Sequence, residues 1–222
     1  MVVAVVAADP VGSAEMTRFA ILLGGDMTPT ERLKQQVGRA RCIAADSGMA
    51  HAAALQLAPE LWVGDFDSAG TELEAAYGHV PRVVHPTDKA ATDGELAVEE
   101  ALKRGATALV LVGGFGGQFD HMLAHATMML ALAEKGIAVF TSSGHEEAYP
   151  LLGALRLSGL TRGTRISVIG MTKLEALSIN GVRWPLKDRE VPFGSSLTMS
   201  NATVGDVELE LRGGKALVLV YP

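Results

Sequence analysis

The chain has 222 residues, enough for one large domain or two small ones, and its composition of 48% hydrophobic and 20% charged residues is typical of a packed globular protein. A formal net charge of −6, with no basic run, argues against a general nucleic-acid binder. A single cysteine, Cys42, excludes an intrachain disulfide and the four-cysteine zinc sites. No apolar stretch approaches the roughly 18 residues of a membrane span, so we expect a cytoplasmic protein without membrane contact.

The first 15 residues carry no motif. They lack the basic segment of a signal peptide, and their apolar part has only about seven residues. We interpret residues 1–15 as a loose N-terminal extension.

From Phe19 to about Thr141, short apolar runs alternate with helical patterns. Strands are expected at 19–23, 41–45, 61–63, 82–84, 108–112 and 137–141, and helices around 29–38, 48–57, 71–77, 92–104 and 120–135. Continuous apolar runs suit strands that are covered on both faces, as in parallel sheets. The alternation predicts an α/β domain, over residues 17–146, with an open parallel sheet and right-handed crossovers.

After Pro150 the pattern changes to short β-like runs separated by Gly and Asn. They lie at 154–160, 164–170, 175–181, 195–201, 206–214 and 215–222. Strands at this spacing favour a small C-terminal β-sandwich domain, over residues 147–222, with the boundary in the segment 144–152.

Acidic residues follow four of the predicted strands. Asp46 follows 41–45, "GDFDS" (64–68) follows 61–63, Asp93 comes after 82–84, and Asp120 comes after 108–112. Ligands of open α/β sheets bind at the carboxyl ends of the strands, where these residues should gather. Acidic turns that only satisfy nearby backbone N–H groups are the simpler alternative for each residue taken alone.

Helix capping explains part of this pattern. Thr92 and Glu95 have the spacing of a capping box, which leaves Asp93 available for another role, and Asp120 is equally well placed to cap the next helix. The glycine-rich loop 113–117 lets backbone N–H groups approach an anion at a helix start, although it matches neither the phosphate-loop nor the dinucleotide fingerprint. Lys89 is the cation nearest in sequence to the acids.

Carboxylates, a glycine loop and one lysine suit a complex of Mg²⁺ with a nucleoside triphosphate. Mg²⁺ prefers oxygen ligands and usually takes one or two carboxylates together with substrate phosphates. Phosphoryl transfer mainly needs positioning and charge neutralisation, so no Ser-His-Asp set is required.

The segments "ADSG", "GDFDS", "DKAATDGELA", "GGFGGQFDH", "GVRW" and "SNA", in this order, resemble those of the thiamine pyrophosphokinase family. The resemblance runs from about Leu22 to the C-terminus. It implies transfer of the pyrophosphoryl group of ATP to the hydroxyethyl group of thiamine, giving thiamine diphosphate and AMP. It also implies an α/β nucleotide domain followed by a β-sandwich, in a homodimer that binds thiamine at the subunit interface.

The resemblance also implies roles for individual residues. The residues expected to hold Mg²⁺ and to act in catalysis are Asp65, Asp67 and Asp93. Those expected to bind the nucleotide are Asp46, Lys89, Thr92, Gly114, Gly117 and Gln118. Those expected to bind thiamine are Asp120, Trp184, Ser200 and Asn201. For Trp184 and Ser200, sandwich packing and turn chemistry explain the residues equally well. The pair Asn180-Gly181 is a turn signal that would place Trp184 on a rim.

Three positions depart from the usual pattern of the family. Ala90 replaces an aspartate, Gln118 an arginine and His125 an asparagine. Two other functions stay open at this point. One is a pyrophosphokinase that acts on a pterin alcohol, and the other is a non-catalytic sensor of thiamine or nucleotide.

Overall fold

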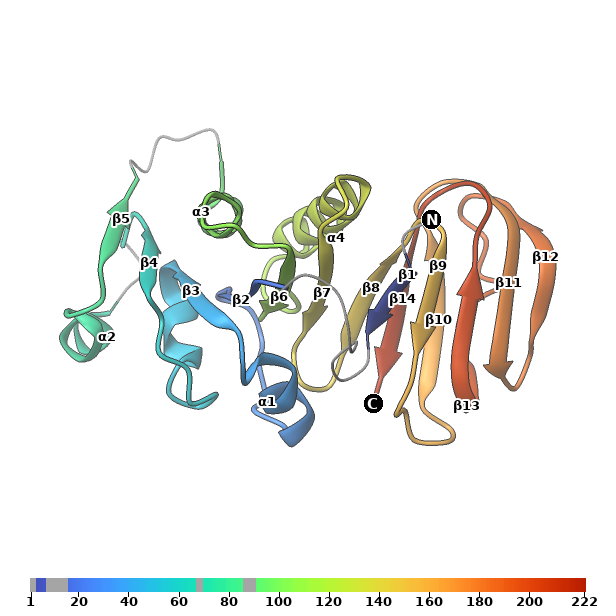
Figure 1. Cartoon of the computed structure of the whole chain (residues 1–222), viewed down its shortest axis with the longest axis horizontal. Helices are drawn as coiled ribbons and strands as arrows, with labels where there is room; N and C mark the ends of the chain where they lie inside the picture. Colours follow the sequence, from blue (N-terminus) through green and yellow to red (C-terminus); the bar gives the residue numbers. More distant parts are fainter. Residues whose placement is uncertain (1–2, 7–15, 67–69, 86–90) are drawn as a thin grey trace. The chain divides into compact units, whose positions relative to one another are not determined.

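The computed structural model describes residues 3–6, 16–66, 70–85 and 91–222. Asp67 and Lys89 therefore lie outside the described residues. The described chain forms two compact units: an α/β unit (16–128 and 139–144) and a mostly β unit (3–6, 129–138 and 145–222) (Figure 1). Within the described residues, no helix is long and apolar enough to cross a membrane.

The strands of the α/β unit are β2 (Arg18–Leu22), β3 (Arg41–Ala45), β4 (Leu61–Gly64), β5 (Arg82–Val84), β6 (Ala108–Val112) and β7 (Ala138–Ser142). β2 pairs in parallel with β3 and β6, β3 with β4, and β4 with β5. All five residues of β6 are buried, as expected of a strand covered on both faces. The prediction of an α/β fold is confirmed, and these parallel pairings bring the carboxyl ends of β2 to β6 to one edge, here called the carboxyl edge.

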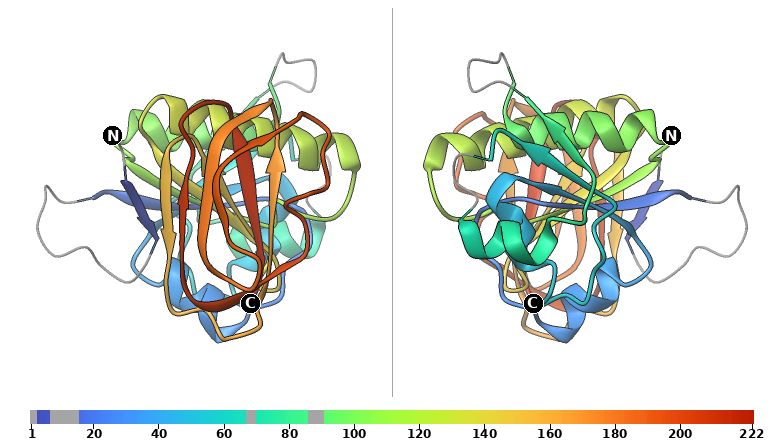
Figure 2. Two further views of the ribbon diagram at one scale, coloured as in Figure 1. Left: turned by 90° about the vertical axis from the view of Figure 1, so that its right-hand side faces the viewer. Right: turned by 90° about the vertical axis from the view of Figure 1, so that its left-hand side faces the viewer.

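The helices of the unit are α1 (Glu31–Val37), the 3₁₀ helix η1 (Asp46–His51), α2 (Thr71–Tyr77), α3 (Asp93–Lys103) and the first part of α4 (Phe119–Glu134), whose residues from 129 onward belong to the β unit. α3 lies on one face of the sheet, and α1, η1 and α2 lie on the other (Figures 1 and 2). Thr30 and Thr92 cap α1 and α3 by accepting hydrogen bonds from the backbone N–H groups of Leu33 and Glu95, each at 3.2 Å. α3 buries its small apolar face, which includes Ala97 and Val98.

The helix predicted at 48–57 is wrong in type and length. The segment forms only the six-residue 3₁₀ helix η1. Gly48 lies close to β2, since a Cβ there would be 2.2 Å from the carbonyl oxygen of Leu22. The segment is pressed against β2, and Gln56, with a φ of 56°, prevents its continuation as a helix.

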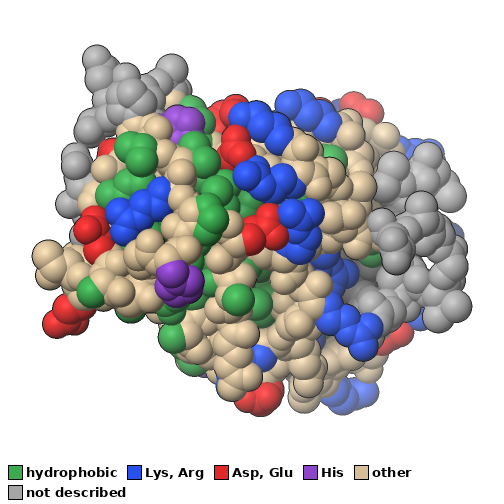
Figure 3. Space-filling view, turned by 60° about the vertical axis from the view of Figure 1, so that its left-hand side comes forward, with side chains coloured by type: hydrophobic (Ala, Val, Ile, Leu, Met, Phe, Trp, Pro, Cys, Tyr) green, Lys and Arg blue, Asp and Glu red, His purple; other side chains and the backbone are tan. Residues whose placement is uncertain are grey.

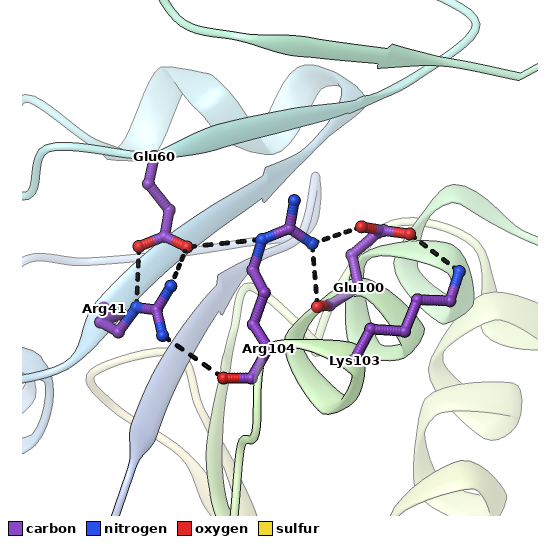
Figure 4. Close-up of polar contacts among 5 residues, drawn as sticks. All are labelled: Arg41, Glu60, Glu100, Lys103 and Arg104. Carbon is purple, nitrogen blue, oxygen red and sulfur yellow. Dashed lines mark hydrogen bonds and ion pairs between the residues drawn. The ribbon is translucent and has the colours of Figure 1, made fainter.

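Charged residues pair at the opposite edge of this sheet, where β3 and β4 begin. Glu60 accepts hydrogen bonds from Nε and Nη2 of Arg41 at 2.9 and 2.7 Å, and it also pairs with Arg104 at 3.7 Å (Figure 4). Glu100 pairs with Arg104 and, at 2.9 Å, with Lys103. We call these five residues the amino-edge cluster.

The strands of the β unit are β1 (Val3–Val6), β8 (Glu147–Leu151), β9 (Ala154–Leu157), β10 (Arg165–Gly170), β11 (Leu174–Val182), β12 (Leu186–Val191), β13 (Asn201–Glu210) and β14 (Ala216–Tyr221). β14 pairs antiparallel with both β8 and β10. β13 pairs with β10 through its first residues and with β9 through its last ones, and it also pairs with β11. Inward residues such as Leu155, Val207 and Val218 are buried, which gives the unit its own apolar core.

Two expectations for these segments are wrong, those for residues 3–6 and for 195–201. Residues 3–6 are not a loose extension but the strand β1, which pairs in parallel with β9 (Val3↔Ala154). The segment 144–152, where the boundary is expected, contains the strand β8, and the two units divide at 144/145. The expected strand at 195–201 is a run of turns, because the chain turns at Ser195 and Ser200 has a φ of 58°. The sequence analysis did not predict β12, because the four central residues of this strand are charged and exposed.

Candidate functional site

Asp46 and Asp65 leave neighbouring strands at the carboxyl edge. β3 and β4 are in parallel register, with Ala45 beside Val63, so Asp46 follows in line with Gly64, the last residue of β4. A Cβ on Gly64 would lie 3.3 Å from both Cα and Cβ of Asp46, so the two loops are packed directly together. Asp46 therefore lies beside Gly64, the residue that precedes Asp65.

The backbone at both acids has an uncommon conformation. Asp46 has a φ of 43°, and Phe66, the residue after Asp65, has a φ of 65°. Non-glycine residues in the left-handed region cost on the order of 1–3 kcal/mol each and persist where surrounding contacts fix them, often at functional sites. The strain therefore marks the loops that carry Asp46 and Asp65.

Asp93 is the first residue of α3, and Thr92 is its cap. α3 packs on β2, β3 and β4. A Cβ on Gly94 would lie 2.9 Å from Cδ2 of Leu23, so the start of the helix is close to the end of β2. The positive end of the helix dipole favours anions at this place, and Asp93 is positioned by it. The hydroxyl of Thr92 is engaged in capping, as the sequence indicated.

The glycine loop 113–117 follows β6 and packs against the loop after β2. The N–H of Gly25 donates to the carbonyl of Gly113 at 3.0 Å, and the N–H of Asp26 donates to that of Phe115 at 2.8 Å. Gly113, Gly116 and Gly117 have φ values of 74°, 75° and 68°, which favour glycine. Gly114 is buried, and a Cβ there would lie 2.5 Å from the hydroxyl of Thr141.

Asp26 is a candidate that the sequence analysis missed. A Cβ on Gly116 would lie 2.1 Å from Oδ2 of Asp26, so this carboxylate lies directly against the glycine loop. The sequence could have indicated Asp26, since "GGD" (24–26) follows the strand predicted at 19–23. Asp26 is thus a fifth acidic residue that follows a predicted strand, as the other four do.

The glycine loop leads into α4. The carbonyl of Gln118 accepts from the N–H of Met122 at 3.1 Å, and the carboxylate of Asp120 accepts from the N–H of His121 at 2.9 Å. Asp120 thus satisfies a backbone donor in the first turn of the helix, in keeping with the capping interpretation. Gln118 and Asp120 are both exposed.

His125 connects the glycine loop with the start of α3. Its Nδ1 lies 3.4 Å from the carbonyl oxygen of Gly114, and its Nε2 lies 3.3 Å from the position of a Cβ on Gly94. Burial lowers the pKa of His125, the hydrogen bond to Gly114 opposes this shift, and nearby His121 adds to it. The residue that departs from the family pattern therefore stays within the candidate site.

Trp184 and Asn201 are brought together in the β unit. The backbone N–H of Trp184 donates to Oδ1 of Asn201 at 3.1 Å, and Nδ2 of Asn201 donates to the carbonyl of Trp184 at 2.8 Å. The indole is 56% exposed, with the guanidinium of Arg183 4.9 Å from its centroid. Ser200, next to Asn201, donates its N–H to Oγ of Ser167 at 2.9 Å.

The predicted turn at Asn180-Gly181 is wrong, because both residues belong to β11. The register with β13 shifts between Asn180 and Val182, and Gly181 has a φ of 76°. A Cβ on Gly181 would lie 1.8 Å from the carbonyl of Asp206, so only glycine fits this bulge. The turn lies instead at Arg183-Trp184, and the indole is exposed as the sequence indicated.

The carboxyl edge offers oxygen donors of the kind that Mg²⁺ prefers. Asp46, Asp65 and Asp93 are all partly exposed, and two of them lie in packed neighbouring loops. In the part of the chain that the structure describes, no three His, Cys, Asp or Glu side chains gather closely enough to hold a metal by themselves. One or two carboxylates with phosphate oxygens are the usual Mg²⁺ arrangement in nucleotide sites, and the donor set fits that arrangement.

Comparisons with known structures give the fold. Thiamine pyrophosphokinase from Bacillus subtilis is 20% identical with a TM-score of 0.81, covering 92% of this chain and 98% of that one. The enzyme from Geobacillus thermodenitrificans is 21% identical with a TM-score of 0.79, covering 92% and 97%. That from Candida albicans is 13% identical with a TM-score of 0.75, covering 93% and 90%. A search of curated proteins gave no match.

Two sequence models of one family match the chain. The model described as thiamin pyrophosphokinase, catalytic domain, matches residues 35–141, which include Asp46, Asp65 and Asp93. The model described as thiamin pyrophosphokinase, vitamin B1 binding domain, matches residues 157–215, which include Trp184 and Asn201. Together they span well over half of the sequence, and the chain belongs to the thiamin pyrophosphokinase family.

Proposed function

We propose that this thiamine diphosphokinase binds ATP with Mg²⁺ at the carboxyl edge and transfers the pyrophosphoryl group to thiamine. The observation that carries the proposal is the packing of the Asp46 and Asp65 loops against each other at strand ends, within the match to the catalytic domain. Neither a pterin alcohol as acceptor nor a role as a sensor is favoured, since both domains of the family match.

Asp65, Asp67 and Asp93 would hold the metal. When bound, Mg²⁺ would neutralise charge on the phosphates and so ease displacement at the β-phosphorus. Asp46, Lys89, Thr92 and the loop residues Gly114, Gly117 and Gln118 would orient the nucleotide. The thiamine hydroxyl oxygen forms a bond to the β-phosphorus, the bond from that phosphorus to the α,β-bridging oxygen breaks, and AMP leaves as the hydroxyl proton is released.

Trp184, Asn201, Ser200 and Asp120 would bind thiamine. The thiazolium ring carries a permanent positive charge, and an exposed indole face can hold such a cation by stacking and cation–π attraction. The two hydrogen bonds between Asn201 and the backbone of Trp184 support this role, because they fix the backbone from which the ring projects.

A product assay tests the reaction. The protein is incubated with ATP, Mg²⁺ and thiamine, and the products are separated and quantified. We expect AMP and thiamine diphosphate in equal amounts, with neither product formed in EDTA. Formation of ADP with thiamine monophosphate would instead indicate transfer of a single phosphoryl group, and turnover of a pterin alcohol but not of thiamine would favour the other acceptor.

We also infer that the β unit is a sandwich, with a domain boundary near 146/147 and a cytoplasmic location for the protein. β13 pairs with β10 through its first residues and with β9 through its last ones, while β11 pairs along its other edge, and this change of partner supports two layers. The segment 145–222 forms most of this unit, which supports the boundary.

A homodimer with thiamine at its interface completes the proposal. Five large apolar side chains of the β unit are exposed, all within a short stretch of sequence: Trp184, Phe193, Leu197, Met199 and Val204. Exposed apolar groups in such number favour an interface.

Mixed subunits test whether the site is shared. Asp65→Asn and Trp184→Ala variants are each assayed alone and after co-refolding, at low thiamine. If Asp65 of one subunit and Trp184 of the other form one site, the mixture regains activity that neither variant has alone. A mixture no more active than the mean of its components, or a monomer in light scattering, contradicts the shared site.

A further inference from the structure

The side chain of Trp62, on β4, contacts both of the loops that carry Asp46 and Asp65. It is fully buried on β4, and its Nε1–H donates a hydrogen bond to the backbone carbonyl of Asp46 at 2.8 Å. Asp46 is the first residue of η1 and has a φ of 43°. One side of the indole is therefore tied to the loop after β3, the strand that precedes β4 in the sheet.

The same indole also contacts the loop after its own strand. The Phe66 ring stands edge-on to it, with centroids 5.0 Å apart and an interplanar angle of 82°. Phe66 is the residue of this loop with a φ of 65°, a conformation that a side chain with a Cβ adopts only where other contacts fix it. The ring contact supplies such a constraint immediately after Asp65.

Arg82 closes this arrangement from the neighbouring strand. It is paired in register with Trp62 on β5, and its guanidinium lies 4.7 Å from the Trp62 centroid and 4.8 Å from the Phe66 centroid. Glu74 lies 3.7 Å from the guanidinium and holds it from α2. Each ring thus contacts the other ring and the cation, and Phe66 has little freedom to change its backbone conformation.

We propose that Trp62 is a positioning residue that sets the separation of Asp46 and Asp65, and thereby the geometry in which metal and nucleotide are held together. It does so through the carbonyl of Asp46 on one side and through Phe66 on the other. This proposal rests on the proposed function, since it assigns Asp65 to the metal and Asp46 to the nucleotide.

Trp62→Phe is the decisive variant, because it keeps an aromatic ring beside Phe66 and Arg82 but removes the N–H. Phe19→Leu is its matched control. Phe19 is also fully buried and paired in register with an arginine, Arg41, whose guanidinium lies 4.4 Å from its ring centroid, but it lies on β2 near the amino end of the strand. Both variants lose core packing, but only Trp62→Phe also loses a hydrogen bond to the loop that carries Asp46.

The readout is Mn²⁺ binding in the presence of a non-hydrolysable ATP analogue, followed by electron paramagnetic resonance. Residues that orient metal ligands typically change metal affinity by 10–100-fold when they are replaced. For Trp62→Phe we expect about a tenfold weaker Mn²⁺ affinity and a lower kcat, with an unchanged thiamine KM. For Phe19→Leu we expect the Mn²⁺ affinity of the wild-type protein. The proposal is overturned if Trp62→Phe binds Mn²⁺ as tightly as the wild-type protein does. It is also overturned if Phe19→Leu weakens Mn²⁺ binding as much as Trp62→Phe does.

Phe66→Gly tests the other contact, and also serves if Trp62→Phe fails to fold. Glycine adopts positive φ freely, so the backbone is accommodated while the ring contact is lost. Weakened Mn²⁺ binding is expected, and wild-type binding would contradict the role of the ring. The proposed function fails separately if the wild-type protein forms no AMP and thiamine diphosphate with Mg²⁺. That result does not depend on how the variants bind Mn²⁺.

Discussion

The two edges of the sheet in the α/β unit use charged residues differently. At the amino edge, Glu60, directly before β4, and Glu100, in α3, pair with arginine and lysine (Figure 4). On the face of the molecule seen in Figure 3, basic side chains likewise lie beside acidic ones. At the carboxyl edge, Asp46 and the residue after Asp65 have positive φ angles. Ion pairing at the first edge stabilises the fold, whereas strained loops at the second edge hold acids in fixed positions, which is the condition for binding a charged ligand.

The largest difference between the edges is expected when a carboxylate becomes an amide. Asp65→Asn should lower kcat by about two orders of magnitude, since a metal ligand and oriented charge supply several kcal/mol of the barrier reduction. Asp67→Asn should behave alike. Glu60→Gln, the control at the amino edge, should keep kcat within about twofold and lose about 1 kcal/mol of stability, because its ion pairs are partly exposed. Normal turnover of Asp65→Asn with Mg²⁺ would show that the acid only forms a turn.

In the β unit the corresponding difference concerns Trp184. Trp184→Ala should raise the thiamine KM by roughly tenfold, equivalent to about 1.4 kcal/mol, and leave the ATP KM unchanged. Trp184→Phe, which keeps a ring, should lose less. Because the indole is exposed, neither variant should lower the melting temperature by more than a few degrees. A large loss of stability with normal thiamine affinity would make the residue structural.

Two glycines of the carboxyl-edge loop form a matched pair. Gly116→Ala and Gly117→Ala both place a Cβ on a residue with positive φ, which costs about 1–2 kcal/mol. Only at Gly116 would the new atom meet Asp26, whereas nothing lies within 4 Å at Gly117. We expect Gly116→Ala to lower the melting temperature more than Gly117→Ala does. When Asp26→Ala is combined with each glycine variant, the two losses should become equal. Equal losses in all backgrounds would mean that Asp26 does not contact the loop.

The smallest expected difference is in pH dependence. The folded pKa of His125 is lowered from its usual 6.5, mainly by burial, so its contribution to stability is present above about pH 6.5 and is lost as the pH falls through the folded pKa. The hydrogen bonds from Lys103 and then Arg104 lower the pKa of Glu100 from 4.5, so its contribution is lost only below about pH 4.5. When the melting temperature is plotted against pH, His125→Asn should therefore flatten the slope just below pH 6.5. Glu100→Gln should flatten the slope only below about pH 4.5. A slope below pH 6.5 that persists in His125→Asn would assign it to another group.

Parts of this structure were accessible from sequence because local patterns determine them. Most strands of the α/β unit are short runs of buried apolar residues, with the exposed β5 as the exception, and Thr92 caps α3 by a contact within one turn. Asp46 and Asp65 could be placed together because parallel strands end at a common edge. Asp67 and Lys89, which lie outside the described residues, stay predictions.

Other parts depend on contacts between residues far apart in sequence. The bulge at Gly181 exists because the carbonyl of Asp206 approaches it, although Asn-Gly ordinarily signals a turn. The role of β1 depends on pairing with β9, some 150 residues away. The Trp62 contact to Asp46 likewise requires the sheet order, since the indole spans two loops that the sequence separates.

Metal-dependent binding of nucleotide at the carboxyl edge is tested most directly by calorimetric titration of the wild-type protein and of the Asp65→Asn and Glu60→Gln variants. Each is titrated with a non-hydrolysable ATP analogue, with and without Mg²⁺. We predict Mg²⁺-dependent binding by the wild-type protein, retained in Glu60→Gln and weakened at least about tenfold in Asp65→Asn, as expected for a lost metal ligand. Binding that is independent of Mg²⁺, or equal in the two variants, would contradict the assignment of Asp65 and the carboxyl edge to the metal–nucleotide complex.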